Sequence, residues 1–347
     1  MTAPRTPARA QQLAILASTG LLVVAVAGCN RGGDGASSGE PTVGYSAGAL
    51  DNPFAVHLAD LVQEKSNATD LTMLSAVNAG GDPAKQVSDF NSLIARGVQG
   101  IVVHPRDSDA IVPAIKAANK ADVPVITVDT AANGGDIYIQ IRADNVAMGE
   151  SACREAGRIA GGTGTVLELF GSLTTTAGAD RHTGFADCMA RDFPGITVIG
   201  KNTNWATAQA ADAAQVVLST NDVKAVFLAS DSVMLPAVQK VMENLGQWLP
   251  TGQAGHVGVI TIDGSAESLD AVRAGYVDSV ISQPIDQYGI LAAAYLEKAV
   301  AGEELTTGPT DHDSEIVENN GNLEDVLPSP VVTVDNVDDD SLWGNLA

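Results

Sequence analysis

The sequence predicts an α/β protein built from two parallel β-sheets, each covered by helices on both faces. From Pro41 onward, short apolar runs of the kind found in fully buried strands alternate with amphipathic helical patterns. The alternation restarts after Asp144-Asn145, which indicates two successive βα series and therefore two sheets. The chain has 347 residues, and the part beyond its N-terminal leader suits two domains better than one.

Residues 1–28 are predicted to be an export signal. Arg5 and Arg9 lie in a head without acidic residues, and the apolar run 13–27 is too short for a membrane span of about 20 residues. The run ends in Ala27-Gly28-Cys29, which resembles a bacterial lipoprotein signal in which Cys29 would be lipidated. The alternative is a plain secretion signal followed by an incidental cysteine.

Residues 29–40 are predicted to be a flexible tether. The segment is small, polar and rich in glycine, so it buries too little apolar surface to order itself. A lipid on Cys29 would anchor the folded part to a membrane, because buried acyl carbons contribute about 0.8 kcal/mol each.

The first βα series follows the tether. Its strands are expected at Val43 to Ser46, Leu71 to Ala76, Gly100 to Val103 and Val125 to Val128. Helices are expected between them. The helix over 82–97 is well marked, with Asp82 as N-cap, Pro83 in the first turn and Gly97 at its end. Another helix is expected over 109–120.

The second series repeats this pattern. Its helices are expected over 146–159, 179–191, 206–218 and 233–245. Its strands are expected over 165–169, 197–199, 225–228 and 257–262. Further elements are expected over 265–274, 279–281 and 285–301. The acidic stretch 302–327 is expected to be irregular, and 330–334 to form a last strand.

Composition limits the class of partner. The formal net charge of −23 argues against nucleic acid, because phosphate binding needs clustered lysine and arginine. The acidic run 338–340 is interpreted as solvated surface. The five histidines lack the spacing of a metal site, so neither a metal nor another cofactor is expected. Cys153 and Cys188 lie on predicted helices that flank one strand, and they could form a disulfide or remain separate buried thiols.

Polar and aromatic side chains follow the predicted strands, where open parallel sheets bind ligands. These residues are Asn52, Phe54, His104, Asp129, Ser230, Asp231, Asp263 and Gln283. Carboxylates and amides suit a ligand with many hydroxyls, and Phe54 and Trp205 could lie against its C–H faces. Each aspartate alone could be a helix cap or turn residue, and His104 alone could be structural. Their coincidence with one another and with an arginine favours a binding site.

Several of these residues belong to longer motifs. In chain order the motifs are Leu50-Asp51-Asn52-Pro53-Phe54, Asp82-Pro83-Ala84-Lys85-Gln86, Pro105-Arg106-Asp107-Ser108-Asp109-Ala110, Val123-Pro124-Val125-Ile126-Thr127-Val128-Asp129, Ala143-Asp144-Asn145, Asp180-Arg181 before Gly184-Phe185, and Ile262-Asp263-Gly264. Together they resemble the ribose-binding type of periplasmic sugar-binding proteins over roughly 43–337.

The resemblance implies the type I periplasmic binding protein fold, in which three hinge strands join two lobes that close over a ligand. The N-terminal lobe would hold 41–143 plus 284–327, and the C-terminal lobe 144–283 plus 328–347. The ligand-binding residues that it implies, some of them matched only by position, are Asn52, Phe54, His104, Asp129, Arg181, Trp205, Ser230, Asp263 and Gln283.

Four positions depart from the ribose binders. Those proteins have a second phenylalanine where Ala55 stands, asparagine in place of His104 and Ser230, and arginine in place of Thr130. The missing arginine removes a fork of hydrogen-bond donors, and Ala55 leaves space. A larger or differently configured sugar, or a polyol, is therefore expected on the same footing as ribose.

The sequence as a whole predicts a non-enzymatic solute-binding lipoprotein. It would be a monomer on the outer face of the cell membrane, or in the periplasm, and would deliver a monosaccharide or polyol to ABC permease subunits. Ligand would stabilise the closed state that engages the permease. One alternative is a sensory module that reports a sugar, autoinducer or nucleoside to a receptor. Another is a glycoside hydrolase with Asp129 and Asp263 as its carboxylates. A sugar-responsive repressor is disfavoured by the export signal.

Overall fold

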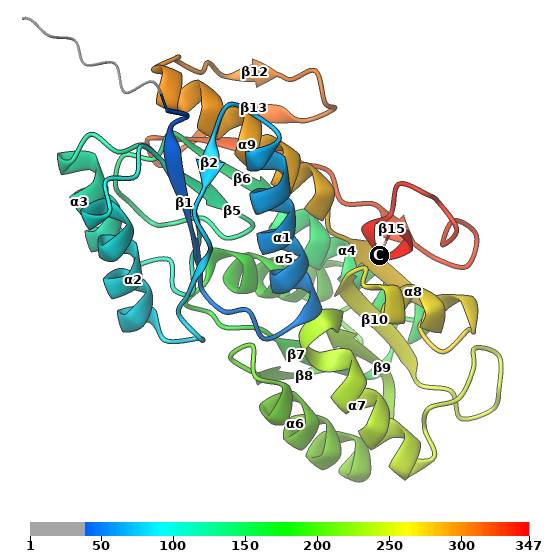
Figure 1. The fold of residues 1–347 in the computed structure, drawn as a ribbon. Helices are drawn as coiled ribbons and strands as arrows, with labels where there is room; N and C mark the ends of the chain where they lie inside the picture. Colours follow the sequence, from blue (N-terminus) through cyan, green and yellow to red (C-terminus); the bar gives the residue numbers. More distant parts are fainter. Residues whose placement is uncertain (1–38, 347) are drawn as a thin grey trace, which may run out of the picture. The chain divides into compact units, whose positions relative to one another are not determined.

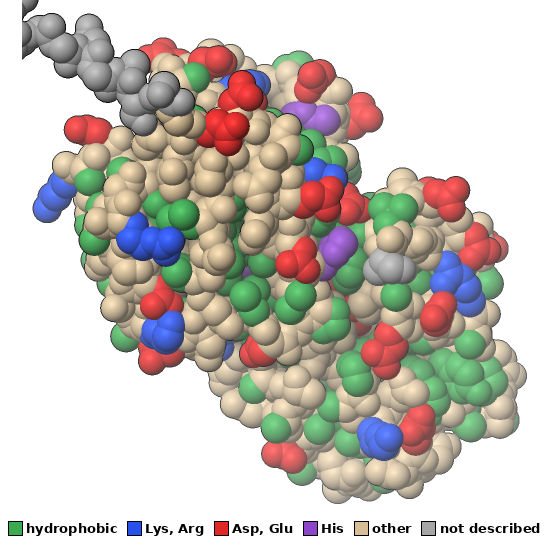
Figure 2. Space-filling view, viewed as in Figure 1, with side chains coloured by type: hydrophobic (Ala, Val, Ile, Leu, Met, Phe, Trp, Pro, Cys, Tyr) green, Lys and Arg blue, Asp and Glu red, His purple; other side chains and the backbone are tan. Residues whose placement is uncertain are grey.

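A computed structural model describes residues 39–346 of the chain. The predictions of a signal at 1–28, of lipidation at Cys29 and of most of the tether fall outside these residues. Within the described part, no helix is both long and apolar enough to cross a membrane. Acidic side chains are spread over the face drawn in Figure 2 and outnumber the basic ones there, as the net charge of −23 requires.

The first β-sheet is formed mainly by the N-terminal part of the chain (Figure 1). Its strands are β1 (Thr42–Ala47), β2 (Thr72–Met73), β3 (Val77–Asn78), β4 (Ile101–His104), β5 (Val125–Val128), β6 (Ile139–Ala143), β12 (Gly308–Pro309), β13 (Glu315–Asn319) and β14 (Asn322–Leu327). They run in the order β12-β13-β14-β6-β5-β4-β1-β2, and β3 also pairs with β1. Pairing is parallel from β14 to β2 and antiparallel in the β12–β13–β14 hairpins.

The second sheet comes from the middle of the chain and a short return from the C-terminal segment. Its strands are β7 (Gly164–Phe170), β8 (Ile196–Asn202), β9 (Val223–Leu228), β10 (Gly258–Asp263), β11 (Ser279–Ser282) and β15 (Val331–Val332). They run in the order β15-β11-β10-β9-β7-β8, parallel except for β15. Both sheets are mainly parallel, as predicted, and antiparallel pairing is confined to one edge of each sheet.

Helices cover both sheets. The first sheet carries α1 (Pro53–Asn67), α2 (Pro83–Ala95), α3 (Val112–Lys120) and α9 (Ile285–Ala301). The second sheet carries α4 (Asn145–Ile159), α5 (Thr176–Asp192), α6 (Thr207–Thr220), α7 (Asp231–Leu245) and α8 (Ala266–Arg273), with the 3₁₀ turn η1 (Trp343–Asn345) beside α8. We call each sheet with its helices the first and second lobe.

Both faces of the first sheet are buried, as the lack of polar alternation predicts. In β4, Ile101 and Val103 pack with Phe90 of α2, whereas Val102 between them belongs to the core that includes Leu58 of α1. Consecutive side chains of a strand point to opposite faces, so α1 and α9 lie on one face and α2 and α3 on the other. The two-lobe α/β prediction is confirmed.

The chain passes between the lobes three times. The crossings lie between β6 and α4, between β11 and α9, and between β14 and β15. Each lobe is therefore assembled from separate parts of the sequence, as the predicted fold class requires.

The acidic stretch 302–327 was wrongly predicted to be irregular. It forms β12, β13 and β14, and β14 pairs in parallel with β6, a strand that the sequence reading did not identify. The acidic residues in β14 misled the prediction because their buried carboxylates are paired within the fold. Asp325 accepts hydrogen bonds from Tyr295 and Ser314, and Glu324 accepts one from Gln140. Of the predicted strand over 71–76, only the short β2 forms, and β3 begins just after that range.

Helices α4 and α5 approach each other closely enough to require glycine. A Cβ atom on Gly149 would lie 2.1 Å from the main-chain oxygen of Arg181, and one on Gly184 would lie 2.1 Å from that of Val146. A disulfide between Cys153 and Cys188 joins the same two helices. This contact fixes the position of α5, which carries Arg181 into the site described next.

Candidate functional site

A cavity of about 120 Å³ lies between the lobes, at the carboxyl ends of their strands. This is about tenfold the ~10–15 Å³ that one water needs by the same measure. All the ligand-binding residues named from the sequence line it, namely Asn52, Phe54, His104, Asp129, Arg181, Trp205, Ser230, Asp263 and Gln283. Asp231, which also follows a strand, is absent from the lining, because its carboxylate accepts from the main-chain N–H groups of Gly264 and Ser265.

Asp129 follows β5 and presents its carboxylate to the cavity. Its Oδ2 lies 3.1 Å from His104 Nε2 and accepts a hydrogen bond of 3.0 Å from the Thr130 hydroxyl. Its Oδ1 is buried and has no hydrogen-bond partner among the described residues. Burial acts to raise the pKa of Asp129, but His104, Arg181 and Thr130 together outweigh it and hold the pKa below its ordinary value. The group is therefore a charged acceptor at neutral pH.

Arg181 is the buried cation of the site. Its Nε donates to Asn145 Oδ1 at 2.8 Å, and its Nη1 donates to the main-chain oxygen of Ala229 at 2.7 Å. The guanidinium carbon lies 5.9 Å from the centre of the Trp205 ring. These contacts fix the orientation of the guanidinium, whose Nη2 lies 4.0 Å from Asp129 Oδ1.

Asp263 ends β10 on the opposite side of Arg181, with Oδ1 3.8 Å from Nη1. Its carboxylate accepts from the Ser230 hydroxyl at 2.5 Å, from Gln283 Nε2 at 3.0 Å and from the main-chain N–H of Ser232 at 3.3 Å. Burial, together with the charge of Asp231, raises the pKa of Asp263 to about 7, and the nearby Arg181 opposes this shift. Asp263 thus differs from Asp129 in binding a proton near neutral pH.

The remaining predicted residues hold the walls of the cavity. Asn52 caps α1, since its Oδ1 accepts from the main-chain N–H of Ala55 at 3.0 Å. Asn52 therefore both caps a helix and lines the cavity. Phe54 follows in the first turn of α1 and is 6% exposed. Trp205 donates from its indole nitrogen to Thr175 Oγ1 at 3.1 Å, which fixes its ring at the cavity wall.

Four polar residues line the cavity although they were not selected as ligand-binding residues from the sequence, namely Asp51, Arg106, Thr130 and Thr175. Arg106 lies in a motif that was recognised, and a basic side chain just beyond the end of β4 in so acidic a chain was a usable signal. Thr175 is the N-cap of α5 and supports Trp205. No local pattern connects those two residues, because they are adjacent only in the folded chain.

The two lobes touch along one side of the cavity. The main-chain N–H of Ser108 donates to Thr174 O at 2.9 Å, and Ser108 Oγ accepts from the N–H of Thr176 at 3.0 Å. Arg106 Nη2 donates to the main-chain oxygen of Asn204 at 3.1 Å. Because each bond joins one lobe to the other, the structure is a closed form of the protein.

Among residues 39–346, no three His, Cys, Asp or Glu side chains form a group able to hold a metal ion. The lining of the cavity offers carboxylate, guanidinium, amide and hydroxyl groups beside aromatic faces. Such a set can hydrogen-bond a small polar molecule and enclose its apolar faces.

Comparison with known proteins agrees with this geometry. A sequence model described as the periplasmic binding protein domain matches residues 43–304. The ribose import binding protein of Salmonella typhimurium is 29% identical over 76% of this chain and 86% of its own length. The xylitol-binding protein of Mycolicibacterium smegmatis is 26% identical over 94% of this chain and 87% of its own.

Solved structures also resemble this one. An ABC transporter solute-binding protein from Mycobacterium smegmatis with bound glycerol has a TM-score of 0.75 and 25% identity, covering 86% of this chain and 96% of its own. A solute-binding protein from Bacillus halodurans with bound myo-inositol has a TM-score of 0.75 at 20% identity, covering 88% and 98%. At that identity the second likeness concerns the fold alone.

Proposed function

The chain belongs to the periplasmic binding protein domain family, and from this premise we propose that it is the solute-binding component of an ABC importer for a monosaccharide or polyol. The proposed lobes, 41–143 with 284–327 and 144–283 with 328–347, close around one molecule of ligand. The protein acts by binding and release without covalent chemistry, and its partners are the permease subunits. The proposal includes a lipid on Cys29 as the membrane anchor and a monomeric state.

One observation carries the proposal. Asp129 Oδ1 is a buried charged acceptor without a partner among the described residues, and Arg181 Nη2 lies 4.0 Å from it. A ligand hydroxyl placed between them could donate to the carboxylate and accept from the guanidinium at the same time. Both bonds would be charge-assisted, and such bonds are stronger than neutral ones. A hydroxyl can use both groups at once because it has one donor and two acceptor lone pairs.

The rest of the cavity extends this pattern to a ligand with several hydroxyls. Asp263 and Gln283 add a carboxylate and an amide, and His104 Nδ1 is buried without a partner among residues 39–346. Phe54 and Trp205 supply flat apolar surfaces for C–H groups. Sugars and polyols combine these two properties.

The choice between sugars and polyols depends on four lining residues. Ala55, His104, Thr130 and Ser230 replace larger or different side chains of the ribose binders, and all four border the cavity. Thr130 and His104 both satisfy Asp129 Oδ2, which leaves Oδ1 for the ligand. We therefore place pentitols such as xylitol beside pentoses in the proposal.

A thermal-shift screen of the purified protein tests the proposal. The panel is D-ribose, D-allose, D-fructose, xylitol, myo-inositol and glycerol. A compound present at about 1,000 times its dissociation constant adds about 4 kcal/mol to the free energy of unfolding. Asp129→Asn and Arg181→Ala should abolish the shift, whereas Asp222→Asn, at a side chain that is 85% exposed, should retain it. The proposal fails if no compound stabilises the protein, and the site assignment fails if both site variants bind as well as the parent protein.

A further inference from the structure

Trp343 is a buried aromatic residue near the C-terminus of the chain. It lies in η1, beyond the third crossing, and is 4% exposed. Its segment is fastened to the second lobe: β15 pairs with β11, and Arg273 of α8 binds the main-chain oxygen of Val337 at 3.2 Å and Asp338 at 2.7 Å. The neighbouring Gly344 packs so tightly that a Cβ atom on it would lie 2.4 Å from Gly264 O. Trp343 must therefore move with the second lobe.

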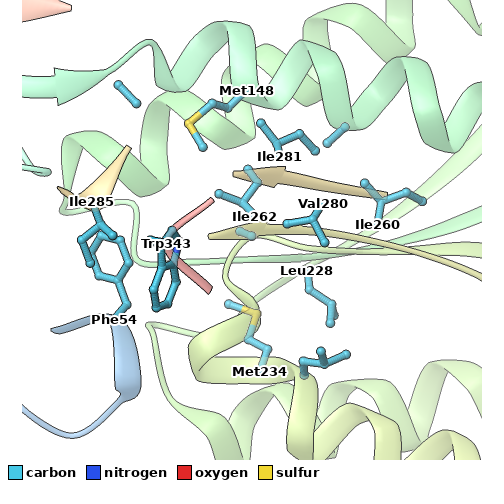
Figure 3. Close-up of a cluster of buried hydrophobic side chains, with 14 of the residues drawn as sticks. Phe54, Met148, Leu228, Met234, Ile260, Ile262, Val280, Ile281, Ile285 and Trp343 are labelled. Atoms are coloured by element: carbon cyan, nitrogen blue, oxygen red, sulfur yellow. The ribbon is translucent and has the colours of Figure 1, made fainter. Parts of the chain in front are cut away.

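The ring of Trp343 contacts the first lobe. Its centre is 6.3 Å from the Phe54 ring at an interplanar angle of 80°, an edge-to-face contact. It is 5.5 Å from the His57 ring at 21°, a stacked contact. Figure 3 shows the indole beside the Phe54 ring. Both partners lie on α1, and Phe54 lines the cavity. The indole thus packs against a residue of the cavity wall, Phe54, and does not itself line the cavity.

The indole nitrogen reaches a second cavity residue. Trp343 Nε1 donates to the main-chain oxygen of Asp263 at 2.7 Å, and the same oxygen accepts from the N–H of Gln283 at 2.9 Å. Asp263 has φ 118°, a backbone conformation that L-residues rarely adopt and that persists only where the surroundings hold it. The hydrogen bond from Trp343 therefore helps to set the direction in which the Asp263 carboxylate points.

We infer that Trp343 is a positioning residue for the ligand site: from behind the cavity it holds Phe54 of the first lobe and Asp263 of the second in register when the lobes close. The inference rests on the proposed function, because the placement of Phe54 and Asp263 matters only if the cavity binds a ligand. It also assigns a role to the C-terminal segment, whose described residues, up to 346, do not line the cavity.

The inference has a consequence for opening of the lobes. The segment is fastened to the second lobe and the ring lies against α1, so opening of the lobes at this point would separate Trp343 from Phe54 and His57. These contacts therefore stabilise the closed form relative to the open form. Because the ligand can leave only when the lobes open, such contacts slow ligand release.

The contact between Trp343 and α1 can be removed from either lobe, by substituting Trp343 in the second lobe or His57 in the first. Trp343→Ala should weaken binding roughly tenfold or more, since both an aromatic contact and a hydrogen bond are lost. Trp343→Phe retains a ring and loses only the indole N–H, so a loss of about 2- to 12-fold is expected. His57→Ala changes no residue of the second lobe or of the cavity lining. Loss of the stacked contact with Trp343 should weaken ligand binding by about 2- to 12-fold.

Trp248→Ala is the matched control. Trp248 stacks on Tyr276 at 5.4 Å and 8° in the second lobe and does not line the cavity. This substitution should lower the thermal midpoint of the ligand-free protein and leave the dissociation constant unchanged. A residue that only supports folding would behave in the same way as Trp248.

Calorimetric titrations with xylitol, D-ribose and glycerol give the dissociation constants, and stopped-flow displacement gives the release rates. The inference predicts a faster release rate for Trp343→Ala and His57→Ala, with partial recovery in Trp343→Phe. It is overturned if Trp343→Phe and His57→Ala are folded and bind as tightly as the parent protein. If the parent protein binds none of these compounds and none of the wider panel, the proposed function has failed, and this inference falls with it.

Discussion

The unfolding free energy of the ligand-free protein should depend on pH through Asp263, and Asp263→Asn should remove that dependence. The carboxyl group is 2% exposed and has a pKa of about 7, raised from its ordinary value of 3.8 by burial and by Asp231. Between these two pH values, the folded chain binds a proton that the unfolded chain has released. The free energy of unfolding therefore rises as the pH falls through 7, and the gain is complete below the ordinary pKa.

The size of the effect follows from linkage. Each pKa unit corresponds to about 1.4 kcal/mol, so a shift from 3.8 to about 7 predicts that the protein is about 2 kcal/mol more stable at pH 5 than at pH 7 from this group alone. His182 and His312 have pKa values raised by their acidic partners, and they act in the same direction, because protonated histidine is favoured in the folded state. Asparagine at position 263 cannot ionise. Burial also raises the pKa of Asp231, which interacts with Asp263, so a comparison of the two proteins measures the loss of one carboxyl group from this pair.

Urea unfolding followed by tryptophan fluorescence and far-ultraviolet circular dichroism measures this difference. The parent protein should gain about 2 kcal/mol more than Asp263→Asn between pH 7 and pH 5. Above pH 7.5, Asp263→Asn should be the more stable of the two, since it no longer holds a buried charge beside Asp231. Parallel pH profiles for the two proteins would refute the reasoning and would place the ionisation of Asp263 in its ordinary range.

Three further outcomes follow from the contacts described above. Reduction of the Cys153–Cys188 disulfide should lower the free energy of unfolding by about 3–4 kcal/mol, because the bond spans a sequence separation of 35 residues; equal urea midpoints with and without dithiothreitol would contradict this. Gly149→Ala should cost about 1–3 kcal/mol, since its Cβ would lie 2.1 Å from a main-chain oxygen of α5. Gly134→Ala, where the nearest atom is 3.5 Å away, should stay within about 0.5 kcal/mol, and thermal melts that rank the two alike would exclude the clash. Ser108→Ala removes a hydroxyl that accepts a hydrogen bond from the other lobe. It should weaken sugar or polyol binding about 2- to 12-fold and change the thermal midpoint of the ligand-free protein little. An unchanged dissociation constant by calorimetry would contradict this.

The elements that the sequence predicted well are those that local chemistry determines. The side chain of Asp82 caps α2 by accepting from the N–H groups of Ala84 and Lys85, and Pro83 occupies the first turn. Gly97 follows the helix with φ 77°, which favours glycine. Capping and backbone conformation depend on neighbours in the sequence, so the pattern alone locates this helix.

The elements that the sequence missed depend on distant partners. Strand β14 contains Glu324 and Asp325, residue types that are depleted in strands. It forms because it pairs with β6 and because polar side chains donate hydrogen bonds to these carboxylates. The same distinction applies to the site. Asp129 and Asp263 could be selected because each follows an apolar strand, whereas Trp343 comes close to them only through the return of the C-terminal segment.

The pairing of β14 with β6 has a consequence for synthesis of the protein. Gln140 and Glu324 are paired across a sequence separation of 184 residues, so a nascent chain exposes the edge of β6 until nearly the whole polypeptide has left the ribosome. Contacts between such distant segments form late and slowly. Completion of the first sheet must therefore wait until almost all of the chain has been synthesised.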